Sequence, residues 1–233
     1  MSTTRTLAAL ALATGLALSG CSKSTSSVSE GRTPEEVMTL SKKTLDETSG
    51  VQLDLSTDDL PDGVTGVSKA SGIVTHAPAF EGTITVKTGL GTFEIPVIGV
   101  DGKTYADTPL SNGYTVVDPG EYGAPVPGLL IDPDTGVSNL LTATENVEKG
   151  DEVRGGKDNK EILTEYTGTV PAANVEALIP SATGDDFEAT YTIASNGELR
   201  EVVLTGQFYE GAEDNTYVVD FTDYGTDKDI AAP

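Results

Sequence analysis

The chain is poor in the residues from which proteins build covalent cross-links and metal sites. Its 233 residues include one cysteine, Cys21, one histidine, His76, and no tryptophan. An internal disulfide is therefore excluded, and the protein must hold itself together by burying apolar surface. Because thiolate and imidazole groups are so scarce, we expect no zinc, haem or iron–sulfur site and no cofactor.

Positive charge is also scarce. The sequence has 14 Lys and Arg residues against 37 Asp and Glu residues, which gives a net charge of −23. The basic residues are scattered, apart from the pair Lys42-Lys43. Binding of nucleic acid needs a basic patch, so we expect no nucleic-acid partner. An anionic membrane surface repels the protein for the same reason, and the acidity itself favours solubility.

The sequence also lacks the common catalytic signatures. A Ser-His-Asp hydrolase would have to use His76, yet no Gly-x-Ser-x-Gly motif occurs, and we expect this histidine in a solvated turn before Ala77-Pro78. Residues 132–136 begin like a calcium loop but lack its later ligands, so we expect a type I turn that caps a helix. We therefore predict no enzyme. A hydrolase formed by two carboxylates from distant strands remains an alternative.

A single long apolar run is present, at the N-terminus. Arg5 is followed by the twelve apolar or small residues Leu7 to Leu18 and then by Leu18-Ser19-Gly20-Cys21. The run is shorter than the roughly 20 residues that cross a bilayer. We predict a signal peptide over 1–20 and lipidation of Cys21, which would anchor the protein to the outer face of the cytoplasmic membrane. A plain signal peptide is less favoured, because it would export an unpaired thiol.

Beyond the cysteine we expect one tether and one domain. Residues 21–32 carry the acylated cysteine and a serine-rich, flexible segment. The domain, 33–233, begins with a helix at Thr33-Pro34-Glu35-Glu36. Thr33 is a good N-cap, Pro34 suits the first helical position and Glu36 completes a capping box. We expect Gly50 to end this helix.

From Val51 onward the apolar residues recur with a period of two, which predicts strands with one wet face. Asp101-Gly102 and Asn196-Gly197 favour tight hairpin turns. Short helices are expected near 135–144 and 172–179. We predict a single α+β domain in which a large antiparallel sheet curls around a few helices. The nine expected strands are near 51–55, 72–75, 83–87, 92–97, 103–106, 162–170, 187–194, 199–206 and 216–221.

Several segments, in order and spacing, resemble the LppX/LprAFG lipoproteins of mycobacteria, most closely the LprG branch. They are Ser71-Gly72-Ile73-Val74-Thr75, Gly82-Thr83-Ile84-Thr85-Val86, Val100-Asp101-Gly102-Lys103-Thr104-Tyr105-Ala106 and the stretch Ile131 to Leu141. The resemblance implies a half-barrel sheet around helices, similar to lipoprotein carriers, with an apolar cavity. It also implies carriage of acylated lipids, lipoglycans and triacylglycerol beside a major-facilitator exporter. The marked acidity, and Tyr114 where relatives can carry tryptophan, leave the particular lipid open.

We therefore expect an envelope lipoprotein that binds acylated lipids in its cavity and passes them on by exchange. Exposing one long acyl chain to water costs on the order of 12 kcal/mol, so release into water is excluded. The alternative is a scaffolding lipoprotein with a filled core that binds a partner protein. The residues that we expect to line the cavity are Ile84, Val86, Ile95, Val97, Leu140, Leu141, Val202 and Leu204.

Overall fold

A computed structural model describes residues 27–156 and 159–233. The predicted signal peptide and Cys21 lie outside the described residues, so both stay predictions. Near the end of the predicted tether, Val28 packs on the domain: its amide donates to the Ser195 carbonyl at 2.8 Å, and its side chain contacts the core. Within the described residues, no helix has the length and apolar character needed to span a bilayer.

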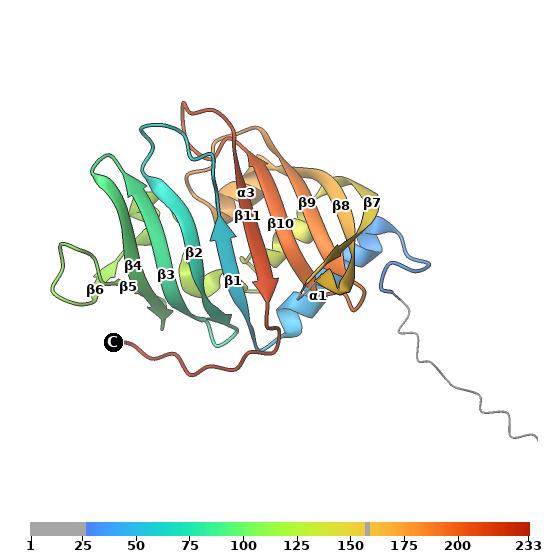
Figure 1. The fold of residues 1–233 in the computed structure, drawn as a ribbon, viewed down its shortest axis with the longest axis horizontal. Helices are drawn as coiled ribbons and strands as arrows, with labels where there is room; N and C mark the ends of the chain where they lie inside the picture. The colour runs from blue at the N-terminus through green and yellow to red at the C-terminus, as the bar shows by residue number, and fades with distance from the viewer. Residues whose placement is uncertain (1–26, 157–158) are drawn as a thin grey trace, which may run out of the picture.

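The fold is one open antiparallel sheet of eleven strands (Figure 1), which confirms the predicted α+β class. Two meanders, β1 to β6 and β7 to β11, are joined by pairing of β1 with β11, so the order is β6-β5-β4-β3-β2-β1-β11-β10-β9-β8-β7. The strands are β1 (Gly50–Ser56), β2 (Gly66–Thr75), β3 (Ala79–Thr88), β4 (Gly91–Val100), β5 (Lys103–Ala106), β6 (Thr115–Val117), β7 (Glu145–Gly155), β8 (Glu161–Pro171), β9 (Asp186–Ala194), β10 (Leu199–Gly206) and β11 (Asn215–Thr222).

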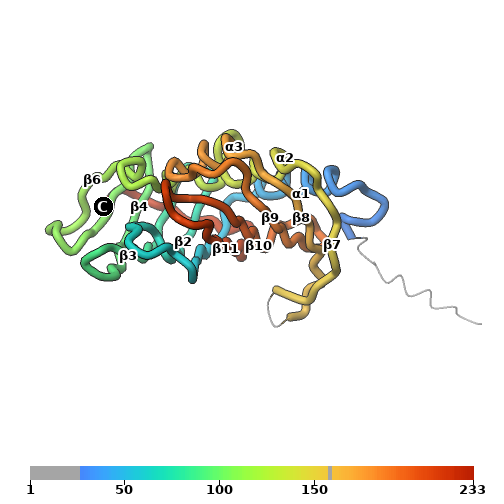
Figure 2. The backbone as a smooth tube through the Cα atoms, turned by 90° about the horizontal axis from the view of Figure 1, so that it is seen from above, coloured from blue at the N-terminus to red at the C-terminus, as the bar shows by residue number. Residues whose placement is uncertain are grey.

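Three helices cover one face of the sheet, over the half that holds β7 to β10 (Figure 2). They are α1 (Pro34–Glu47), α2 (Ser138–Ala143) and α3 (Ala172–Leu178). The predicted start of α1 is confirmed. The Glu36 amide donates to the Thr33 hydroxyl at 3.3 Å, and the Thr33 amide donates to the Glu36 carboxylate at 2.9 Å. This capping box satisfies two amides that the helix itself leaves unpaired.

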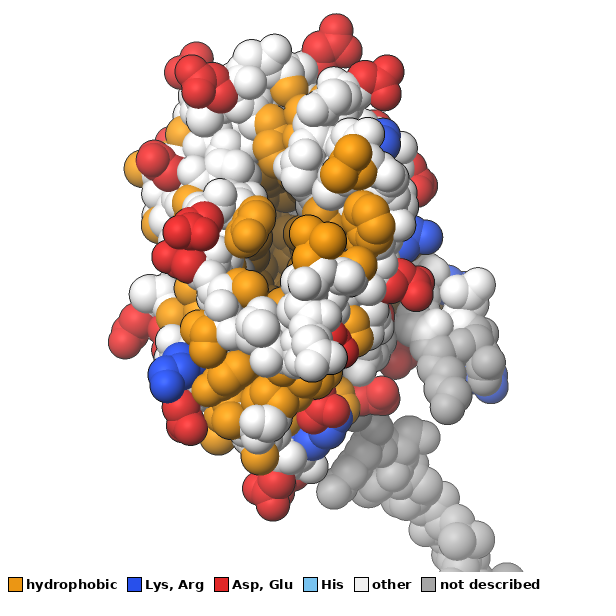
Figure 3. All heavy atoms as spheres, turned by 90° about the vertical axis from the view of Figure 1, so that its left-hand side faces the viewer, with side chains coloured by type: hydrophobic (Ala, Val, Ile, Leu, Met, Phe, Trp, Pro, Cys, Tyr) orange, Lys and Arg blue, Asp and Glu red, His pale blue; other side chains and the backbone are white. Residues whose placement is uncertain are grey.

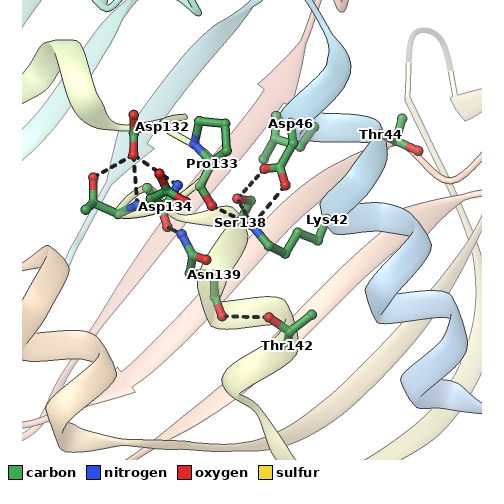
Figure 4. Close-up of polar contacts among 12 residues, drawn as sticks. Lys42, Thr44, Asp46, Asp132, Pro133, Asp134, Ser138, Asn139 and Thr142 are labelled. Atoms are coloured by element: carbon green, nitrogen blue, oxygen red, sulfur yellow. Dashed lines mark hydrogen bonds and ion pairs between the residues drawn. The ribbon is translucent and has the colours of Figure 1, made fainter.

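The turn before α2 differs from the expectation. Asp132 Oδ1 accepts hydrogen bonds from the Asp134 and Thr135 amides, at 3.0 and 2.9 Å (Figure 4). These bonds hold residues 132–135 in a turn, so the helix begins at Ser138 and not at Thr135. Lys42 of α1 then secures the junction, since its ammonium donates to the Pro133 carbonyl at 2.8 Å.

Two strands were not predicted, and both lie at the edges of the sheet. β6 has only three residues, too few for a period to be recognised. β7 has eleven residues but is largely exposed and rich in charge, so it lacks an apolar alternation. Its pairing with β8 is interrupted by two register shifts.

The two halves of the sheet are covered differently. Over β7 to β11 the helices enclose a packed core that includes Leu45, Phe187, Tyr191 and Phe221, all fully buried. Over β2 to β4 the covering chain is the segment 118–137, which contains the short 3-10 helices η1 (Pro119–Tyr122) and η2 (Pro127–Leu129). A cavity lies between this segment and the sheet.

Candidate functional site: an apolar cavity

The cavity has a volume of about 720 Å³ and opens at the β3–β6 end of the molecule, where Figure 3 shows a hollow among apolar side chains. Its sheet wall comes from β3 and β4. Strand alternation turns the same face of both strands inward, and pairing places Ile84 opposite Ile95 and Val86 opposite Phe93. The inward residues of this wall are Phe80, Ile84, Val86, Phe93, Ile95 and Val97.

The remaining walls are also apolar. Proline-rich chain from η1 and η2 faces the sheet, and β1, β2 and β11 close the inner end. None of the described residues that line the cavity is charged. The described part of the chain also contains no group of three acidic, histidine or cysteine side chains able to hold a metal ion. The cavity can thus hold apolar chains, and its volume lies within the roughly 300–1,000 Å³ of small-molecule sites.

The structure divides the eight predicted cavity residues into two groups. Ile84, Val86, Ile95 and Val97 lie along the cavity. Leu140 and Leu141 of α2 and Val202 and Leu204 of β10 instead lie in the packed core beneath the helices, each with at most 4% of its surface exposed. We leave these four out of the site. These four side chains point inward as expected, but they pack in the core beneath the helices and do not border the cavity.

Sequence reasoning missed the rim of the cavity. Leu90 in the β3–β4 turn is 94% exposed, and Leu110 in the β5–β6 loop is 99% exposed, yet both border the opening. Of the exposed large apolar side chains in the described chain, only Ile162 lies away from this end. The signal was present in Gly89-Leu90-Gly91, where a leucine stands at a turn that normally carries polar residues. The others at this end are Tyr114, Val116, Tyr122, Val126 and Leu129.

Two tyrosines that the sequence did not indicate lie at the inner end. The hydroxyls of Tyr209 and Tyr217 are 2.7 Å apart, and the Tyr217 hydroxyl donates to the Val67 carbonyl at 2.9 Å. Burial raises the pKa of both phenols, and for Tyr217 the neighbouring hydroxyl of Tyr209 raises the pKa further. Both side chains are therefore protonated at neutral pH and form a polar pair in a largely apolar wall.

The other residues considered from the sequence have structural partners. His76 lies in the β2–β3 turn as expected, but it is half-buried and its Nε2 is 3.0 Å from the Leu45 carbonyl oxygen. At Asp132, burial opposes the charged form, but hydrogen bonds from Thr135 and Asp134 outweigh it and lower the pKa. The Asp132 carboxylate thus fixes a turn, as the failed calcium-loop pattern suggested.

An open antiparallel sheet with a helix-covered core in one half and an apolar cavity in the other defines a cavity-forming α+β domain. A family model described as LppX_LprAFG lipoprotein matches residues 33–232, and the chain belongs to this lipoprotein family. The resemblance to this family that the sequence shows is thus confirmed. A comparison with curated protein sequences gave no match.

Two solved structures share the fold. LprF from Mycobacterium bovis superposes with a TM-score of 0.67 at 16% identity, over 86% of this chain and 96% of LprF. The lipoprotein LppX from Mycobacterium tuberculosis gives a TM-score of 0.61 at 18% identity, over 85% of this chain and 98% of LppX. At such low identities the likeness concerns the fold alone.

Proposed function

We propose that this protein is a membrane-anchored envelope lipoprotein that binds the acyl chains of lipids in its cavity and passes the lipids through the cell envelope. The observation that carries the proposal is the cavity itself, apolar, uncharged among its described lining residues and open at a rim of exposed leucines. Membership of a lipoprotein family supports it. The cargo would be acylated lipids or lipoglycans, with triacylglycerol among them.

The physical cost of exposing acyl chains determines the mode of transfer. Each buried CH₂ contributes about 0.8 kcal/mol, so a long chain cannot leave the cavity for water on a useful timescale. Transfer must be an exchange between two apolar environments. The rim residues Leu90 and Leu110 provide an apolar contact at the mouth, where the cavity and a second apolar phase could become continuous.

The sequence supports a lipid anchor, and the family resemblance supports a partner. A diacylglycerol on Cys21 would hold the domain at the outer face of the cytoplasmic membrane, where donor and acceptor lipids are concentrated. The family resemblance supports an exporter of the major-facilitator type as the partner. The scaffolding alternative required a filled core, and the open space beneath β3 and β4 disfavours it.

Substitution of Ile84 by tryptophan tests the lipid site. Ile84 borders the cavity, so the larger ring should occupy space that cargo would fill. We expect Ile84→Trp to retain far less co-purified lipid in a native mass spectrum while its melting temperature changes by only a few degrees. If the face were packed, overpacking would cost about 1–3 kcal/mol and the melting temperature would fall clearly.

Thr85→Trp is the matched control, because residue 85 alternates to the other face of β3. It should retain lipid like the parent protein. Equal lipid retention by Ile84→Trp and the parent would contradict the proposed site, and so would a large loss of stability.

A further inference from the structure

The two tyrosines at the inner end of the cavity have a fixed hydrogen-bond direction. A carbonyl oxygen can only accept, so the single hydroxyl proton of Tyr217 is committed to the Val67 carbonyl, 2.9 Å away. The 2.7 Å contact between the two hydroxyls also needs a proton, and only Tyr209 can supply it. The Tyr209 oxygen then has lone pairs but no free proton, so it can accept a hydrogen bond from a ligand but cannot donate one.

Neighbouring residues hold this arrangement in place. Tyr217 is buried, and its ring meets the Phe208 ring edge-on with the centroids 4.9 Å apart. Tyr209 is half-buried, and a side chain at Gly66 would overlap its hydroxyl oxygen, so glycine at this position on β2 leaves room for the phenol. Both tyrosines and Gly66 line the cavity. The acceptor is therefore positioned before any ligand enters.

The other hydroxyls along the cavity belong to Tyr122 at the mouth and to threonine and serine residues, for example Thr104 and Ser181. Thr88 and Thr108, near the rim, also donate to protein oxygens, the Gly91 carbonyl at 3.0 Å and the Ser111 hydroxyl at 3.1 Å. A threonine or serine hydroxyl without such a bond can rotate and offer a donor or an acceptor, so it tolerates a ligand group of either kind. At the inner end of the cavity, both phenol protons are committed to protein oxygens, so the half-buried Tyr209 oxygen offers an acceptor and no donor. This site therefore distinguishes a ligand that donates a hydrogen bond from one that only accepts.

We propose that the Tyr209 oxygen is a subsite for an alcohol of the bound lipid, and that the cavity prefers acylated lipids with a free hydroxyl over fully esterified ones. The inference rests on the proposed function and specifies its cargo. When the lipid hydroxyl donates a hydrogen bond to the Tyr209 oxygen, it extends the series of hydrogen bonds that runs from Tyr209 to Tyr217 and on to the Val67 carbonyl. An ester in the same place would bring its lone pairs against those of the phenol, and would leave a polar contact unmade within an apolar cavity.

A matched pair of lipids tests the subsite. Dioleoylglycerol has one free hydroxyl, and its acetylated derivative carries the same two acyl chains but no donor. The purified protein is loaded from detergent micelles that hold both lipids in equal amounts, and a native mass spectrum gives their ratio. One neutral hydrogen bond corresponds to a preference for the free alcohol of roughly two- to tenfold. Tyr209→Phe should bring the ratio close to one.

The control is Tyr122→Phe, because Tyr122 borders the same cavity at its mouth, where the side chain is 66% exposed. This variant should keep the preference of the parent protein. Melting temperatures of both variants show that each is folded.

The outcomes separate the two proposals. If both lipids bind equally to the parent protein, or if Tyr209→Phe keeps the preference, the subsite is wrong while lipid binding stands. If neither lipid binds, the proposed function fails and the subsite fails with it. Preference by the parent and by Tyr122→Phe, lost only in Tyr209→Phe, supports the alcohol subsite.

Discussion

Asp54, Asp220 and Glu201 lie opposite one another on the neighbouring strands β1, β11 and β10. They occupy the outer face of the sheet, since the residues that alternate with them, such as Leu53 and Phe221, are buried in the core. Partial burial raises the pKa of Asp220, and the Asp54 carboxylate raises it further. The pKa of Glu201 is also raised, first by partial burial and then by the Asp220 carboxylate. At neutral pH these charges oppose folding.

The sign of the resulting pH dependence follows from the direction of these shifts. Because the folded-state pKa values are raised, these carboxylates bind protons more readily in the folded protein than in the unfolded chain. The cluster therefore lowers the free energy of unfolding at neutral pH. This destabilisation fades as the pH falls through the raised pKa values. We expect Asp220→Asn to raise the free energy of unfolding at pH 7 by about 0.2–1 kcal/mol. The gain should shrink at about pH 4, near the ordinary carboxyl pKa.

Urea denaturation at the two pH values measures the effect. Glu94→Gln on β4 is the control, because Glu94 lies opposite Thr85 and has no carboxylate across the strand pair. A stabilisation by Asp220→Asn that is the same at both pH values would argue against carboxylate repulsion as its cause.

Single residues also show how far the site could be predicted. Ile84 and Val202 have the same local pattern, an apolar side chain in an alternating strand, and both face inward. Alternation identifies the face of a strand but not what lies opposite: Ile84 meets the cavity, whereas Val202 packs beneath the helices. Tyr209 lies just beyond the end of β10, where no period applies, and its role depends on partners that are distant in sequence.

At the scale of elements, local chemistry was a reliable guide where one short segment determines the structure. The capping box at Thr33 formed as predicted. The turn between β4 and β5 has positive φ at both Asp101 (54°) and Gly102 (69°), as a type I′ turn requires. Between β9 and β10 only Gly197 has a positive φ, so Asn196-Gly197 forms a turn of another kind. β7 could not be predicted, because its pairing with β8 and not its own sequence places it in the sheet.

The prediction at the scale of elements concerns the β3–β4 turn and the β5–β6 loop, which hold Leu90 and Leu110. If Leu90 and Leu110 enter a membrane during exchange, replacing both by serine should slow transfer of a fluorescent lipid to phosphatidylcholine vesicles. Full burial of a leucine contributes about 1.5–3 kcal/mol. Partial burial of two leucines would stabilise the membrane contact through which transfer proceeds, so their loss should lower the transfer rate about tenfold. The amount of lipid retained before vesicles are added should not change, because both residues lie at the rim.

Ile162→Ser provides the control for this pair. Ile162 lies on β8, is 45% exposed and is far from the cavity opening in the order of strands. If this variant slows transfer as much as the double variant does, general surface hydrophobicity and not the rim determines the rate.

At the scale of the whole molecule, the start of the described chain and strands β4 to β6 lie at opposite ends (Figure 1). Val28 joins the domain at the β9–β10 turn, while the mouth lies beside β3 to β6. The six peptide units from Cys21 to Ser27 reach at most about 21 Å. A lipid on Cys21 would therefore hold the β7–β10 end close to its membrane and leave the mouth at the far end of the sheet.

The anchor is tested by Cys21→Ser. We expect this variant to remain in the aqueous phase of a detergent extraction, while the parent protein enters the detergent phase because of its acyl chains. The melting temperature should not change, since Cys21 belongs to the predicted tether and not to the predicted domain. If Cys21→Ser still enters the detergent phase and carries the same added lipid mass as the parent protein, residue 21 is not the anchor.

The open sheet has a further consequence for how copies of the protein coexist. An unclosed sheet exposes two rows of unpaired backbone groups, and each could template a strand from a second molecule. Here one border, β6, offers only three residues, and the other, β7, is bent by two register shifts and bears charges of both signs. Neither border suits a flat, regular addition of strands. Copies crowded together on one membrane are thus protected from joining into fibrils, and the cavity can stay open without closure of the sheet into a barrel.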